Sequence, residues 1–172
     1  MKKNLLLMVC MLMAAFSAMA GSKVKIADGD KDVLKETAVA ALKIDYSSAV
    51  WEDQGDFKTW CGSDYDDRVT KTTTAYVESF NSNSKGLQIG ASNVKYDMVF
   101  NIKSMERHQS FTGVWGQCKV YVTGTISIID KTSGKTVLTI NVDKCGGGTD
   151  FVVTDGMVKC FKSLGKEVAK LK

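Results

Sequence analysis

The feature that most constrains the fold is a long alternation of apolar and polar residues in the C-terminal half of the chain. Apolar side chains recur at alternate positions along residues 119–128 and again along residues 138–143. A period of two indicates strands with one buried and one solvated face. Between the two arms, Gly134 suits the positive φ angle of a bulged turn. We therefore predict a hairpin in which Ile126 faces Ile140.

Shorter runs of the same kind predict further strands at residues 24–26, 38–46, 87–89 and 94–103. Apolar residues at helical spacing predict two amphipathic helices, at residues 64–81 and 155–171. Consecutive half-buried strands are typical of an antiparallel meander with one face to cover. We predict an α+β fold. It is a two-layer sandwich with a mostly antiparallel sheet of five or six strands and both helices packed on one face.

Residues 1–20 have the features of a secretory signal peptide. Lys2 and Lys3 precede an apolar run at residues 5–16, and an A-x-A cleavage sequence ends at Ala20. The run is shorter than the roughly 20 residues that cross a membrane. We expect a single exported domain, residues 21–172, that is periplasmic or secreted and has no transmembrane segment. An outer-membrane lipoprotein anchored through Cys10 is disfavoured, because the larger Val9 stands where a lipobox has a small residue.

The charge of the chain gives no reason to expect a nucleic-acid ligand. The formal net charge is +4, and it falls to +2 without Lys2 and Lys3, because no acidic residue precedes Gly21. Nucleic-acid-binding domains are usually far more basic.

Residues 47–62 combine aromatic and acidic side chains without a clear period. Connections of this length are often functional, and a tryptophan beside hydrogen-bonding groups suits contact with a sugar or a peptide. Candidate binding residues are therefore Trp51, Asp53, Phe57, Trp60 and, from a second irregular stretch, Trp115. The alternative is that the tryptophans fold down as a lid on the core.

Sequence signatures of catalysis are missing. There is no G-x-S-x-G, P-loop, H-E-x-x-H or G-x-G-x-x-G motif, and we expect neither a cofactor nor a metal. A small hydrolase would need Glu52, Asp53, Asp56 or His108 to line a cleft. Nothing in their spacing singles these residues out, so we expect a protein that is not an enzyme.

Four cysteines follow the signal peptide, and an even number in an exported chain predicts two disulfides. The hairpin register directs Cys118 inward and Cys145 outward. That favours Cys118 with Cys160 and Cys61 with Cys145. The competing set, Cys61 with Cys118 and Cys145 with Cys160, stays open, as do free buried thiols.

The pattern resembles a known periplasmic domain. A helix ending in residues 76–81 precedes the strand at residues 94–100 and the hairpin at residues 125–137. This order resembles the α/β domain shared by the N-terminal part of TolB, CsgG and the LpoB-type activators, and residues 147–155 look like small exported proteins of Bacteroidetes. The resemblance implies a fold and no catalytic residue.

Three functions follow as hypotheses. The first is a non-catalytic accessory module that docks a protein of the cell envelope. The second is a glycan- or peptide-binding protein that uses residues 47–62. The third is the small hydrolase.

Overall fold

The computed structural model describes residues 23–52, 54–109 and 116–171. The predicted signal peptide lies outside the described residues. The elements in chain order are β1 (Val24–Gly29), η1 (Lys31–Lys35), β2 (Val39–Asp45), β3 (Val50–Trp51), α2 (Phe57–Cys61), η2 (Gly62–Asp64), α3 (Tyr65–Asn83), β4 (Gln88–Ile89), β5 (Val94–Gln109), β6 (Cys118–Asp130), β7 (Thr136–Asp150) and α4 (Val153–Ala169).

The predicted hairpin is confirmed. β6 and β7 pair antiparallel with Ile126 opposite Ile140 and Ile128 opposite Leu138. All four side chains are buried, and Gly134 in the turn has a φ of 67°. Turn chemistry and the burial pattern therefore select the same register.

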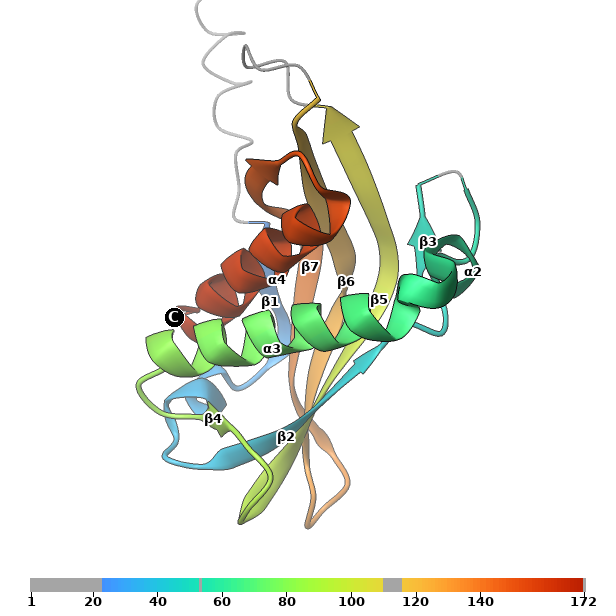
Figure 1. Ribbon diagram of the computed structural model, residues 1–172. Coiled ribbons are helices and arrows are strands. Elements are labelled where there is room, and N and C mark those ends of the chain that lie inside the picture. Colours follow the sequence, from blue (N-terminus) through green and yellow to red (C-terminus); the bar gives the residue numbers. More distant parts are fainter. Residues whose placement is uncertain (1–22, 53, 110–115, 172) are drawn as a thin grey trace, which may run out of the picture.

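The predicted sheet is wrong in its strand count and in its strand directions. In the described part of the chain, seven strands form one mixed, curled sheet in the order β1-β7-β6-β5-β2-β4, and β3 also pairs with β5 (Figure 1). β2 runs parallel to both β4 and β5. The reason is the connection from β2 to β5, which contains the 19-residue helix α3. A helical crossover returns the chain to its starting edge, so the next strand runs in the same direction.

Helices α3 and α4 cross the same face of the sheet (Figure 1). The core lies between them and the inward side chains of the strands. Its fully buried members include Tyr76 and Phe80 from α3, Phe161 and Leu164 from α4, and Met98, Phe100, Ile126, Ile128, Leu138 and Ile140 from the sheet. The opposite face of the sheet carries the polar half of each alternation.

The predicted disulfides are not present. Cys61, Cys118, Cys145 and Cys160 are free, buried thiols. The prediction that Cys145 points outward fails because β7 bulges at Lys144, which places Cys145 opposite Val122 and turns it inward. There the Cys160 thiol donates to the Cys145 carbonyl at 3.2 Å.

In the part of the chain that the structure describes, no helix has the length and apolar character that a membrane crossing requires.

Candidate ligand-binding face of the sheet

The aromatic residues at positions 51–60 close one end of the core. Trp51 and Phe57 are 1% and 0% exposed. The rings of Trp51 and Trp60 stack with centroids 3.9 Å apart, and the Arg68 guanidinium lies 4.5 Å from the Trp60 ring. The structure thus brings Trp51, Phe57 and Trp60 together as predicted, but their rings pack against one another. Asp53 and Trp115 lie outside the described residues.

The carboxylates of the same stretch have separate contacts. Asp56 accepts a hydrogen bond from the Thr59 amide at 2.7 Å at the start of α2, and that bond lowers the pKa of the Asp56 carboxyl. Glu52 accepts from the Arg107 amide at 2.6 Å. Its own backbone has a φ of 49°, a conformation that non-glycine residues seldom adopt.

A shallow hollow of about 300 Å³, here called the edge hollow, lies beside β5 and is lined by Glu52 and residues 104–108. Of the predicted hydrolase residues, the structure brings Glu52 and His108 to this hollow, while Asp56 lies at the start of α2. β5 extends to Gln109, six residues beyond the predicted end of this strand at residue 103, so His108 lies on a strand.

Glu106 is the carboxylate next to His108. Its Oε1 atom lies 3.4 Å from His108 Nε2 and 2.9 Å from Lys144 Nζ. Partial burial raises the pKa of Glu106, but the contacts with Lys144 and His108 outweigh burial and leave the pKa below its ordinary value. Glu106 therefore carries a charge near neutral pH, which suits accepting hydrogen bonds and not donating a proton.

Two β-bulges meet on the face of the sheet that the helices leave open. Lys103 is the extra residue of β5 between Ile102 and Ser104. On the other side of β6, the bulge of β7 places Lys144 at a φ of 46°. The Lys144 amide donates to the Thr123 hydroxyl at 3.1 Å, so Thr123 lies between the bulges. Bulges are frequent beside functional sites, where they redirect side chains.

Between these bulges is a second hollow of about 460 Å³, here called the bulge hollow. Its floor is closely packed, because a Cβ atom on Gly124 would lie 2.3 Å from the Asn101 carbonyl oxygen. Its wall offers amide, hydroxyl, carboxylate and ammonium groups within a small area. The polar side chains are Ser48, Asn101, Lys103, Thr123, Thr125, Asn141 and Asp143.

Tyr121 precedes Thr123 by two residues on β6, so the two side chains lie on one face, about 7 Å apart along the strand. Its ring lies over Gly146, where a Cβ atom would come within 2.6 Å of the ring. The Lys23 and Lys119 ammonium groups are 4.9 and 5.2 Å from the ring centroid. His108 meets the ring edge-on at 5.2 Å. We call Lys23, His108, Lys119, Tyr121 and Gly146 the Tyr121 cluster.

Sequence reasoning missed this face. The polar residues of this face are visible in the sequence, because they alternate with the apolar residues that predict the hairpin. Thr123 and Thr125 alternate in this way in the first arm, and Asn141 does so in the second. The bulges that hollow the surface have no such signal. Among the described residues, no group of three or more His, Cys, Asp or Glu side chains is placed to hold a metal ion.

A comparison with protein-family models finds no match for this chain, and neither does a comparison with curated proteins. Solved structures give distant likenesses. The PelC dodecamer from Paraburkholderia phytofirmans is 18% identical with a TM-score of 0.46, over 88% of this chain and 99% of PelC. A homolog of the neuraminyllactose-binding hemagglutinin from Helicobacter pylori is 11% identical with a TM-score of 0.42, over 79% and 86%.

At these TM-scores, neither likeness carries an argument about this chain. The resemblance to the TolB, CsgG and LpoB domains stays a prediction.

Proposed function

We propose that the protein is a non-catalytic carbohydrate-binding module of the cell envelope or its surroundings. The ligand would lie across the bulge hollow and the Tyr121 cluster. The observation that carries the proposal is the meeting of two bulges on either side of Thr123, which leaves a hollow among amide and hydroxyl groups on the open face of the sheet.

The side chains suit a ligand made of hydroxyl groups. Asn101 and Asn141 each offer a donor and an acceptor, and the Thr123 and Thr125 hydroxyls offer both in one atom. A sugar ring also has an apolar face, for which the Tyr121 ring is a flat partner with a polar tip. Binding sites of this kind combine a surface for apolar contact with a few fixed polar groups.

The charges favour a glycan with carboxylate groups. Lys23 and Lys119 flank the tyrosine ring, and Lys103 lines the bulge hollow. Lys144 is paired with Glu106 at 2.9 Å, so its charge is already matched. Asp143 is the one carboxylate among the residues that line the bulge hollow.

The test is isothermal titration of the chain with neutral and uronic-acid oligosaccharides of four to six units. We expect saturable binding that is tighter for the acidic series. Tyr121→Ala and Asn141→Ala should each weaken it about tenfold, equivalent to ~1.4 kcal/mol, whereas Tyr121→Phe keeps the ring and most of the affinity.

Two matched control variants distinguish a specific loss of binding from a general effect of substitution on the folded protein. Phe151→Ala removes an aromatic side chain that is 60% exposed outside the site, and Thr74→Ala changes an exposed position of α3. Both should bind like the native chain. The proposal is overturned if no oligosaccharide binds, or if binding survives in both Tyr121→Ala and Asn141→Ala.

A further inference from the structure

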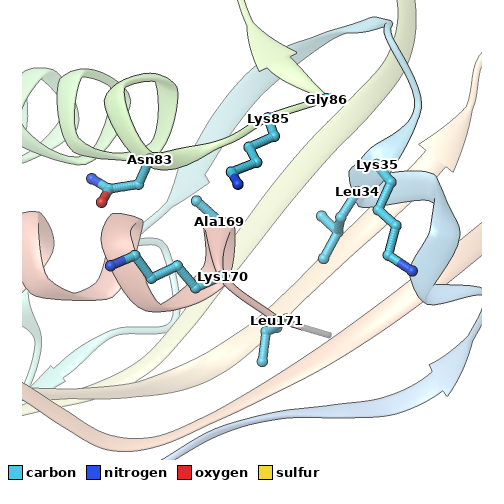
Figure 2. Close-up of a pocket in the computed structure, with 8 residues that line it drawn as sticks. All are labelled: Leu34, Lys35, Asn83, Lys85, Gly86, Ala169, Lys170 and Leu171. Atoms are coloured by element: carbon cyan, nitrogen blue, oxygen red, sulfur yellow. The ribbon is translucent and has the colours of Figure 1, made fainter.

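A third hollow shares no lining residue with the two hollows described above. It has a volume of about 380 Å³ and opens between η1, the connection from α3 to β4, and the end of α4 (Figure 2). Three elements that are distant in sequence thus form one site.

The inner walls of this hollow are apolar. Leu34 is 5% exposed and belongs to the hydrophobic core, and Ala169 and Leu171 pack partly against that core. Figure 2 shows Leu34 and Ala169 on opposite sides of the opening, with Leu171 below them where the chain leaves α4.

The walls are also firmly held. The Leu87 amide donates to the Leu34 carbonyl at 3.1 Å, and the Ser84 hydroxyl donates to the Leu87 carbonyl at 2.6 Å. A Cβ atom on Gly86 would lie 2.3 Å from the Lys35 carbonyl carbon. The connection therefore lies directly on η1, and the hollow is preformed.

Among the described residues that line this hollow, all the charged side chains are lysines. They are Lys35, Lys85 and Lys170, and the Asn83 amide lies beside them. Lys35 is paired with Asp32 at 2.6 Å and points away from the opening, whereas the Lys85 ammonium points toward Ala169 (Figure 2). Among the described residues, Lys85 and Lys170 have no ion pair. Lysines near the C-terminal end of a helix also interact favourably with the helix dipole. That interaction does not account for the apolar hollow beneath them.

We propose that this hollow binds a free single-chain amphiphile with an anionic head, in the chemical class of a medium-chain fatty acid. The acyl chain lies along Leu34, Ala169 and Leu171, and the carboxylate meets the Lys85 ammonium, while the Lys170 ammonium points away from the opening and adds positive charge at a distance (Figure 2). At roughly 30 Å³ for a group the size of a water molecule, the volume has space for on the order of ten methylene groups.

The test is isothermal titration of the chain with hexanoate, octanoate and decanoate below their micelle concentrations. Each additional buried methylene should tighten binding about fourfold, until the hollow is filled. Decanol and decyltrimethylammonium have the same chain with a neutral or a positive head, and both should bind more weakly than decanoate.

Variants of the hollow test the contacts of the ligand's charged head and of its acyl chain separately. Lys85→Gln should weaken decanoate about five- to tenfold, on the order of 1 kcal/mol or slightly more, and leave decanol unchanged. Ala169→Phe fills the hollow and should abolish both. Lys162→Gln, an exposed lysine of α4 outside the hollow, is the matched control and should bind decanoate as the native chain does.

Three results would overturn the proposal: equal affinity for all three heads, no dependence on chain length, or binding only to phosphatidylglycerol vesicles. None of these bears on oligosaccharide binding at the bulge hollow, so the two proposals fail independently.

Discussion

Gly165 of α4 lies so close to Tyr76 of α3 that a Cβ atom on the glycine would sit 2.6 Å from the tyrosine carbonyl oxygen. Beside this contact, the Ser79 hydroxyl donates to the Lys162 carbonyl at 2.6 Å. The two helices therefore meet backbone to backbone at this point, and the glycine sets their separation.

Gly165→Ala should destabilise the protein. Overpacking of a close contact costs about 1–3 kcal/mol, which exceeds the roughly 1 kcal/mol that alanine gains over glycine in a helix. Urea unfolding measures the change. Gly148→Ala is the control, because its nearest neighbour would be the end of the Lys159 side chain at 3.5 Å. An unchanged midpoint for Gly165→Ala would mean that the close contact costs no more than alanine gains over glycine in a helix.

The stacked tryptophans should contribute unequally to stability. Trp51 is 1% exposed, and Trp51→Ala should cost about 3–5 kcal/mol. Trp60 is only partly buried and has the Arg68 guanidinium beside its ring, so Trp60→Ala should cost clearly less. Circular dichroism during chemical unfolding compares the two variants. A larger loss for Trp60→Ala would contradict the description of Trp51 as the core member of the pair.

The four buried thiols should resist modification. Burial raises the pKa of each of Cys61, Cys118, Cys145 and Cys160, that of Cys145 to about 12, and the thiolate is the reactive form. In the chain from residue 21 onward, Ellman's reagent should react slowly under native conditions. It should react with four thiols at once in guanidinium without reductant. Fewer than four would reveal a disulfide.

The Glu36 contacts predict a loss of stability in acid. Lys95 and the Tyr96 hydroxyl both donate to Glu36, and these bonds lower the pKa of its carboxyl. The unfolded chain then takes up the proton first, so the stabilisation is complete above about pH 4.3 and is lost as the pH falls through the lower folded-state pKa.

Glu36→Gln should therefore lower the thermal midpoint at pH 7, and the difference from the native chain should vanish in acid. Glu78→Gln is the control, since Glu78 is exposed on α3 with no ion pair among the described residues. A difference between the native chain and Glu36→Gln that is constant from pH 7 to pH 2 would refute the role of the ionised carboxylate.

Local patterns predict much of this fold. The Ile126–Ile140 register follows from alternation and turn chemistry, and the two long helices begin and end within a few residues of their predicted bounds. Strand direction is a different matter. β2 and β5 alternate like antiparallel strands, and only the helix between them signals that they run parallel.

The candidate binding face could not be predicted from the sequence, because its shape depends on bulges that each insert a single residue into a strand. One extra residue at Lys144 turns Cys145 inward, and one at Lys103 opens the surface beside Thr123. The aromatic composition of residues 47–62, by contrast, suggested a binding site where the structure has core packing. Trp51 and Phe57 have side chains typical of a binding loop, yet they are among the most buried of the described residues.

The position of β1 in the sheet has a consequence for how the chain is made. Residues 24–29 pair with β7, which ends at Asp150, and within the described residues β1 has no other strand beside it. Its ladder hydrogen bonds cannot form until residues 138–142, more than 100 residues further along the chain, have left the ribosome. Closing a loop of this length is slow. β1 therefore joins the sheet only after β7 has been synthesised, so the first strand in the sequence is among the last to be placed.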